Sequence, residues 1–294
     1  MSLFTPFNAS GWLRLLLPVA GVVALGGCAT PGGYPDLAID RSHTAVSQDS
    51  RVQYLVLHFT AEDYPRSLKV LTQGPVSSHY LVTDRQGDTP PRIMQLVDES
   101  RRAYHAGVSY WKGATMLNAA SIGIEIVNLG SRKRGNGVEF AEFDEEQIDL
   151  VVKLVRDIVR RHEIRIDRVV GHSDIAPTRK NDPGPKFPWH RLAEAGLVLW
   201  PDAALVAQKR ALYEAKLPDV RWFQERLAAH GFQVPQNGEL DRATRDVISA
   251  FQMKYRPARY DGEPDAETAA LVDALVEQAR RLVAPPPKPV AVSR

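Results

Sequence analysis

Residue types that bind metal ions gather in two segments of the sequence. His58 lies in one apolar segment, and the stretch VVGHSDIAPTRKNDPGPKFPWHRL (169–192) holds His172, Lys180 and Asp182. Imidazole nitrogen and carboxylate oxygen are ligands that Zn2+ accepts, and catalytic zinc sites use three protein ligands and leave a fourth position open. Two histidines and one carboxylate could therefore form a hydrolytic zinc site, provided that the fold brings the two segments together.

The two histidine segments are expected to be β-strands. VQYLVLHFT (52–60) and RVVGHS (168–173) are short apolar runs rich in β-branched residues. If these strands are neighbours in one sheet, their terminal histidines lie close together, and the loop of prolines and glycine that holds Asp182 can fold back onto them. The spacing alone leaves a second interpretation open, because a single histidine at the end of a strand is usually structural.

The surrounding elements predict an α/β layer with a central sheet. Further strands are expected at 77–83, 92–98 and 121–128. Residues 145–162 carry apolar side chains at helical spacing. Asp144 and Gln147, three positions apart, are typical of a capping box at the start of that helix. Strands and helices thus alternate loosely between residues 50 and 196.

The composition changes after the segment 197–217, which is expected to be a linker. Residues 218–283 lack strand signals and contain two D-x-x-T sequences that begin at Asp241 and Asp265. An aspartate at a helix N-terminus satisfies open backbone N–H groups. We therefore expect a small three-helix unit, followed by a proline-rich tail at 284–294.

The N-terminal segment is typical of an exported lipoprotein. Arg14 precedes an apolar run of 13 residues, which is shorter than the ~20 residues that a membrane span requires. LGGC (25–28) resembles the lipobox of bacterial lipoproteins, which implies a signal peptide at 1–28, lipidation of Cys28, a tether at 29–50 and attachment to the outer membrane. An uncleaved anchor helix and an ordinary signal with a free thiol remain alternatives.

Charge and cysteine content exclude other chemistries. The formal net charge is +2, and no basic cluster is interleaved with aromatic residues, so the sequence does not indicate a nucleic acid partner. Cys28 is the single cysteine, so the chain has no intramolecular disulfide and no cysteine-based zinc site. No G-x-S-x-G sequence occurs, so a serine hydrolase would lack its nucleophile elbow.

Three motifs resemble those of a known enzyme family. VLHFT (56–60), NAASIGIEIVN (118–128) and GHSDIAPTRKNDPGPKFPW (171–189) resemble the zinc-dependent N-acetylmuramoyl-L-alanine amidases of the peptidoglycan-recognition-protein superfamily. The resemblance covers about residues 50–195 and implies a catalytic domain at 51–196 with a central mixed β-sheet flanked by helices. It also implies one Zn2+ per chain, with the ligands His58, His172 and Asp182.

The resemblance implies roles for further residues. Glu125, on the strand face opposite Ile122, Ile124 and Ile126, is expected to be the general base; a salt-bridge residue is the alternative. Lys180 is expected to stabilise the oxyanion. Three side chains are candidate substrate contacts, with packing as the alternative: His105, Trp111 and Asn118. His79 is expected to lie near the site without binding the metal.

The C-terminal unit resembles the three-helix peptidoglycan-binding domains that accompany cell-wall hydrolases, although Leu240 stands where a glycine is usual. Together the resemblances imply an enzyme that cleaves the amide between N-acetylmuramic acid, or its anhydro form, and L-alanine. The expected partners are peptidoglycan or muropeptides. A peptidoglycan-binding lipoprotein without activity and a zinc peptidase that cuts another amide are the alternatives.

Overall fold

The structure, a computed structural model, describes residues 37–135 and 137–283 and divides into two units. The first unit is Met1–Gln48, and the second is Asp49–Arg294. Residues 37–50 contain no helix or strand and are mostly exposed. The expected signal peptide with Cys28 and the proline-rich tail lie outside the described residues.

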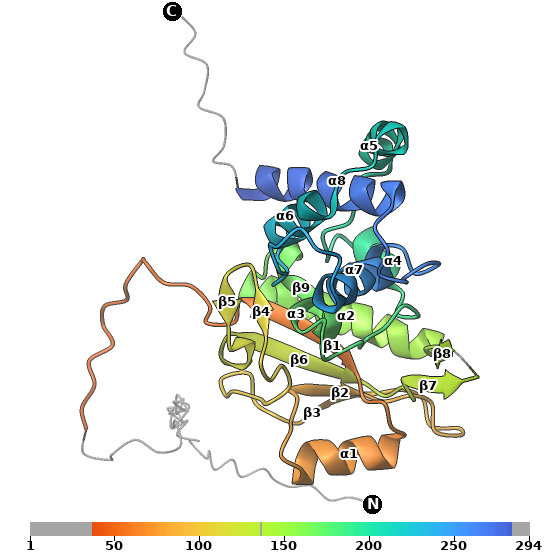
Figure 1. The fold of residues 1–294 in the computed structure, drawn as a ribbon. Helices are drawn as coiled ribbons and strands as arrows, with labels where there is room; N and C mark the ends of the chain where they lie inside the picture. Colours follow the sequence, from red (N-terminus) through yellow and green to blue (C-terminus); the bar gives the residue numbers. More distant parts are fainter. Residues whose placement is uncertain (1–36, 136, 284–294) are drawn as a thin grey trace, which may run out of the picture. The chain divides into compact units, whose positions relative to one another are not determined.

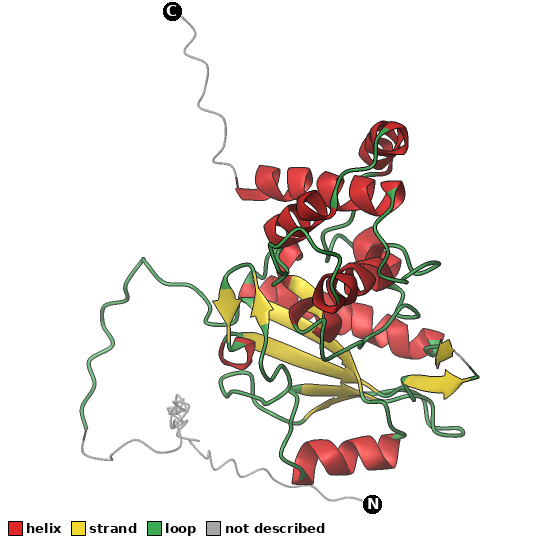
Figure 2. Cartoon of the chain, in the orientation of Figure 1, coloured by secondary structure: helices red, strands yellow, loops and turns green. Residues whose placement is uncertain are grey.

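A five-stranded mixed sheet forms the centre of the second unit (Figures 1 and 2). Its strands are β1 (Tyr54–Phe59), β2 (Tyr80–Val82), β3 (Ile93–Gln95), β6 (Ser121–Ile126) and β9 (Val169–Gly171). Their order is β3-β2-β6-β1-β9, and every pair is parallel except β2 with β3. The mixed central sheet expected from the sequence is therefore confirmed.

The helix α2 (Glu145–His162) covers one face of the sheet. Its apolar stripe packs against alternate residues of β1 and β6 in one buried cluster, which includes Leu55, Leu57, Ile122, Ile124, Ile126, Ile148, Val151, Val155 and Ile158. The isoleucines of β6 thus share the predicted face. Asp144 caps the helix by accepting from the Gln147 backbone N–H at 3.0 Å. The Gln147 side chain does not complete a capping box, because it donates to the backbone oxygens of Val82 and Val127.

The opposite face of the sheet is covered at its two ends and carries His58 and Glu125 between them. At one end α1 (Tyr64–Gln73) packs Leu71 against Leu81 of β2. At the other end Val56 and Val170 belong to a buried cluster with the C-terminal helices. His58 and Glu125 are register partners on the parallel strands β1 and β6, so they point to the same face.

Shorter elements connect these layers. They are β4 (Tyr110–Trp111), β5 (Ala114–Thr115), η1 (Leu117–Ala119), β7 (Ser131–Arg134), β8 (Gly137–Phe140), η2 (Ile166–Arg168), α3 (His172–Ile175) and α4 (Trp189–Glu194). The strands β4 with β5 and β7 with β8 form two antiparallel hairpins.

The C-terminal region contains the three expected helices and one more. The expected helices are α6 (Val220–His230), α7 (Arg242–Tyr255) and α8 (Ala266–Val283). Asp241 and Asp265 accept backbone N–H groups at their N-termini, from Thr244 and Thr268. The additional helix α5 (Ala203–Ala215) occupies most of the segment expected to be a linker. It buries no side chain fully, so it lacks the apolar stripe from which a helix is recognised in a sequence.

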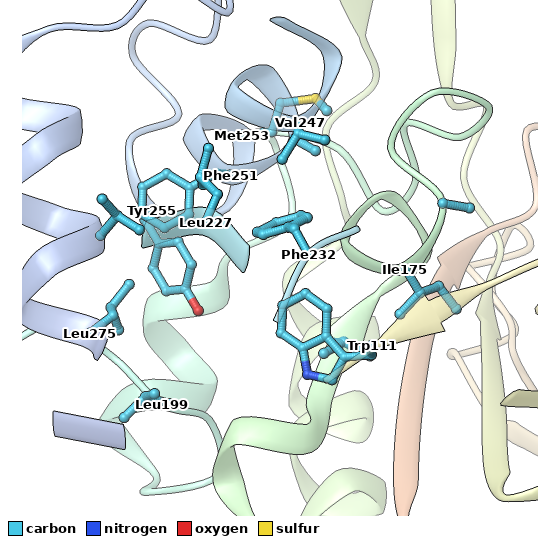
Figure 3. Packing of buried hydrophobic residues seen from close by; sticks show 14 of the residues in the cluster. Trp111, Ile175, Leu199, Leu227, Phe232, Val247, Phe251, Met253, Tyr255 and Leu275 are labelled. Carbon is cyan, nitrogen blue, oxygen red and sulfur yellow. The ribbon is translucent and has the colours of Figure 1, made fainter. Parts of the chain in front are cut away.

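The C-terminal helices share a core with the sheet region. Figure 3 shows Trp111 and Ile175 from the sheet region packed near Phe232, Phe251 and Tyr255. Aromatic rings meet edge to face across this junction, with 5.1 Å between the ring centroids of Trp111 and Phe232. The junction is therefore a packed apolar core.

A buried ion pair crosses the same junction. The side chain of Lys254 on α7 is 4% exposed and donates to Asp174 Oδ2 at 2.7 Å and to the Val169 carbonyl at 3.2 Å. Its ammonium also lies 4.1 Å from the ring centroid of Trp189. Asp174 Oδ2 accepts the Gly171 backbone N–H at 2.8 Å. The α7 lysine thus holds the segment that begins α3.

Among the described residues, no helix has both the length and the apolar character that crossing a membrane would require.

We predict that Lys254→Ala destabilises the protein by about 3–5 kcal/mol, because it leaves the buried carboxylate of Asp174 without its cation. Chemical denaturation monitored by circular dichroism measures this change. Arg134→Ala is the matched control, because Arg134 pairs with Glu139 at an exposed position and its loss should cost about 0–1 kcal/mol. Equal losses in the two variants would contradict the structural role of the Lys254 pair.

Candidate metal centre

Three potential ligand atoms converge at the carboxyl end of the parallel strands. His58 Nδ1 lies 3.0 Å from His172 Nδ1 and 3.0 Å from Asp182 Oδ2, and His172 Nδ1 lies 3.1 Å from the same oxygen. The three residues are 1%, 4% and 5% exposed. They are the one cluster of three or more His, Cys, Asp or Glu residues in the described chain whose ligand atoms are close enough to share a metal ion.

The pairing of strands places the two histidines together. The strands β1 and β9 are parallel neighbours, with Leu57 opposite Gly171, so the residues that follow, His58 and His172, emerge at the same edge. Asp182 returns to this edge because its carbonyl accepts the Ser173 backbone N–H at 2.8 Å. A Cβ on Gly171 would lie 2.7 Å from Pro183 Cδ, so glycine is required for the loop to approach this closely.

The hydrogen bond that His172 makes through Nε2 determines what its other ring nitrogen, Nδ1, presents to Asp182. His172 Nε2 lies 3.2 Å from the Ala106 carbonyl, which can only accept, so Nε2 carries the ring proton. In an imidazole with a single proton on Nε2, Nδ1 is an acceptor, and here it lies 3.1 Å from a second acceptor, Asp182 Oδ2. A positive charge between them satisfies both, and nitrogen and oxygen ligands suit Zn2+. The residues present therefore fit a zinc ion.

The local electrostatics favour the protonation states that bind a metal. Burial and the neighbouring His172 lower the pKa of His58 to about 4. Burial by itself would raise the pKa of Asp182, but the two imidazoles hold it below its ordinary value. A neutral imidazole and an ionised carboxylate are the ligating forms, so both residues are ready to bind a cation at neutral pH.

A cavity of about 390 Å³ opens over the cluster and contains the two expected catalytic side chains. Its lining includes Phe59, Tyr104, His105, Glu125, His172, Arg179, Lys180 and Asp182. Burial raises the pKa of Glu125 well above its ordinary value, with Asp182 adding to the shift and Lys180 opposing it. Among the described residues, Glu125 Oε2 has no hydrogen-bond partner. A larger cavity of about 750 Å³ beside the β7–β8 hairpin is lined by no histidine.

The three candidate substrate contacts lie in different environments. For Trp111 the structure supports the alternative, packing, over a substrate contact. The side chain is 1% exposed, donates its indole N–H to the Asp167 carbonyl and packs against Phe232. Asn118 accepts the backbone N–H groups of His105 and Ala106, and it lines a separate cavity.

His105 lines the cavity over the cluster, but its ring also lies against His58, one of the three candidate ligands. Its Nδ1 is 3.1 Å from His58 Nε2, and its side chain is largely buried. His79 does not belong to the cluster of His58, His172 and Asp182. Its Nδ1 accepts the Gly123 backbone N–H, and its Nε2 lies 3.1 Å from the Arg101 carbonyl.

Sequence reasoning missed two residues of the cavity. Arg179 donates to the carbonyls of Ala106 and Val108 and brings a second positive charge beside Lys180. Tyr104 is half exposed and presents an aromatic ring at the cavity. The sequence offered one signal for them: Arg179 directly precedes Lys180, and Tyr104 directly precedes His105.

Comparisons with known families cover both parts of the chain. Residues 48–185 match the family described as "N-acetylmuramoyl-L-alanine amidase", and residues 216–272 match the family described as "Putative peptidoglycan binding domain". The N-acetylmuramoyl-L-alanine amidase AmiD of Escherichia coli (strain K12) is 44% identical over 271 residues, which are 90% of this chain and 98% of that protein.

Two solved structures extend the similarity to the fold. The complex of AmiD from E. coli with the substrate anhydro-N-acetylmuramic acid-L-Ala-D-gamma-Glu-L-Lys has a TM-score of 0.76 at 43% identity, covering 84% of this chain and 96% of that chain. AmpDh3 from Pseudomonas aeruginosa in complex with anhydromuramic pentapeptide has a TM-score of 0.78 at 40% identity, covering 83% and 99%. The expected fold class is confirmed by these likenesses.

We predict that His58→Ala and Asp182→Ala each weaken zinc binding by more than the roughly 10–100-fold that a change outside the ligand set costs. Elemental analysis after dialysis and competition with a chelator measure the zinc content and affinity. His190→Ala is the control, because His190 is an exposed histidine outside the cluster. Full zinc content in the His58 variant would rule out the assigned ligand set.

Proposed function

Because the chain belongs to the N-acetylmuramoyl-L-alanine amidase family, we propose that it is a zinc-dependent amidase of peptidoglycan. It hydrolyses the amide between N-acetylmuramic acid, or its anhydro form, and the L-alanine of stem peptides. The observation that supports this most directly is the convergence of His58, His172 and Asp182. The cavity beside this cluster is lined by His172 and Asp182 together with Glu125 and Lys180.

The ligand set suits hydrolysis. His58, His172 and Asp182 would hold one Zn2+ per chain, and the ion would supply Lewis acidity toward the scissile carbonyl and make water more acidic. Three protein ligands leave a coordination position free, as catalytic zinc sites require.

Glu125 is the proposed general base. It is the register partner of His58 on the neighbouring strand, so its carboxylate lies on the sheet face that carries the cluster. Among the described residues its Oε2 has no hydrogen-bond partner, so this oxygen is free to bind water. The carboxylate takes a proton from the attacking water and delivers it to the departing amine of L-alanine. A raised pKa suits both steps, because the group must hold the proton between them.

Lys180 is the proposed oxyanion stabiliser. Its ammonium is near enough to lower the pKa of both Glu125 and His58, so its charge acts on the reacting region. A positioned positive charge or donor of this kind contributes about 3–4 kcal/mol to transition states in related chemistry.

The non-catalytic alternative is disfavoured by the chemistry of the site. A binding protein that had lost activity has no need of two imidazoles and a carboxylate within ligand distance of one another, next to a cavity that also holds a carboxyl group without a hydrogen-bond partner. A zinc peptidase would use the same residues, so the identity of the bond cut is what separates it from the amidase.

The two similar structures with ligands contain anhydromuramoyl peptides, which makes anhydro-muropeptides the first substrates to assay. We place the catalytic domain at 51–196 and the peptidoglycan-binding domain at 218–283, joined by the segment 197–217 that contains α5. The C-terminal domain would hold the enzyme on its polymeric substrate.

An enzyme with this family match and a peptidoglycan-binding domain is expected to act in the periplasm at the cell wall. We further propose that the signal at 1–28 is removed, that Cys28 carries the lipid, and that residues 29–50 tether the enzyme to the outer membrane. The lipobox-like sequence LGGC supports this proposal.

We predict that Glu125→Gln retains zinc and lowers kcat by about 10²–10⁴-fold, because the amide cannot transfer protons. Mass analysis of products from an anhydro-muropeptide, with and without a chelator, identifies the bond cut and its metal dependence. Glu146→Gln, an exposed change on α2, is the control. Retained turnover in the Glu125 variant would remove its role, and cleavage elsewhere in the peptide would favour the peptidase.

We predict that Cys28→Ser releases the full-length protein from membranes, because a lipid chain adds about 0.8 kcal/mol of membrane affinity per buried methylene. Fractionation of cells into soluble, inner-membrane and outer-membrane material measures the distribution. A variant that still sediments with the outer membrane would exclude lipidation as the anchor.

A further inference from the structure

His58 is the first member of a chain of hydrogen-bonding groups that leads away from the cavity. Its Nε2 lies 3.1 Å from His105 Nδ1, and His105 Nε2 lies 3.1 Å from Ser121 Oγ. Ser121 Oγ in turn lies 2.6 Å from the Leu117 carbonyl. The four groups therefore form one continuous series that ends on a backbone oxygen.

The direction of every bond follows from that carbonyl. The Leu117 oxygen can only accept, so the hydroxyl proton of Ser121 is directed to it. Ser121 Oγ must then accept from His105 Nε2, which therefore carries a proton. No acid contacts His105 among the described residues, and an imidazole with a single proton, here on Nε2, has its lone pair on Nδ1.

The last step fixes the tautomer of His58. With His105 Nδ1 as an acceptor, His58 Nε2 must donate, and the lone pair of His58 lies on Nδ1. This is the atom that lies 3.0 Å from both His172 Nδ1 and Asp182 Oδ2. The series thus presents the nitrogen that a metal requires.

The strand β6 is shaped to hold His105 in this place. A Cβ on Gly123 would lie 2.5 Å from His105 Cγ, so the imidazole rests directly on the backbone of β6. Ser121 and Gly123 lie two residues apart on the same strand face and contact the same ring. The absent side chain of Gly123 leaves space for the imidazole, and the Ser121 hydroxyl determines which ring nitrogen of His105 carries the proton.

We propose that His105, directed by Ser121 and seated on Gly123, is a positioning residue that fixes His58 in the tautomer able to bind zinc. The role rests on the zinc site of the proposed function, and it differs from the substrate contact expected from the sequence. Partners behind a ligand histidine set its tautomer and orientation, and their loss commonly costs about 10–100-fold in metal affinity.

The test is Ser121→Ala in the full chain. Without the hydroxyl, His105 can move its proton to Nδ1 and donate to His58 Nε2, which would leave the His58 proton on Nδ1. We expect zinc affinity, measured by competition with a chelator, to fall about 10–100-fold. Gly123→Ala should weaken zinc binding by a different route, because the added methyl group displaces the His105 ring.

Long-range ¹H–¹⁵N NMR of the metal-free protein reads the tautomers directly. We expect His58 protonated on Nε2 in the native chain and at least partly on Nδ1 in the Ser121→Ala variant. His79 is an internal reference, because its Nδ1 accepts a backbone N–H and its Nε2 faces a carbonyl, so its tautomer should not change.

Ser78→Ala is the matched control, because Ser78 is also fully buried but its Oγ contacts no hydrogen-bond partner among the described residues. Ser121→Thr keeps a hydroxyl and should restore most of the affinity. Unchanged tautomer and affinity in Ser121→Ala would overturn the positioning role while the zinc site remains. A native chain that binds no zinc would instead overturn the proposed function.

Discussion

The parallel pairing of three strands is the constraint on which the site depends. The strand β1 lies between β6 and β9, so one edge of the sheet receives residues from three distant segments of the chain. His58 and Glu125 are register partners, and His172 follows the strand on the other side. A shift of one residue in either pairing would turn a ligand or the proposed base to the opposite face, where α2 fills the space with apolar side chains.

The loop that carries Asp182 depends on contacts outside the sheet. Its position requires a glycine at 171, and the segment beginning α3 is held through Asp174 by Lys254 of α7. The C-terminal helices therefore stabilise the segment that carries two of the candidate metal ligands while they cover the end of the sheet face. An apolar junction with a buried ion pair couples the two parts more rigidly than a flexible linker would allow.

Much of the fold was predictable from the sequence, because the apolar run of β1, the alternation of β6 and the apolar stripe of α2 are local patterns. The proposed ligand set followed from the resemblance of motifs, since spacing alone allowed His58 to be structural. Trp111 was mistaken for a substrate contact because its burial depends on Phe232, which follows it by about 120 residues and belongs to the C-terminal unit. The helix α5 escaped recognition because it buries no side chain fully.

The glycine at 123 shows why a motif can be recognised before its reason is known. In the sequence, SIGIE marks the strand that carries Glu125, and the glycine has no evident role between the two isoleucines. In the structure, the absent side chain is the space that His105 fills, and Ser121 contacts the far side of the same ring. Glu125 occupies the next position on this face. One strand face therefore carries three groups in order along β6: the Ser121 hydroxyl, the space at Gly123 that the His105 imidazole fills, and the carboxylate of Glu125, the proposed general base.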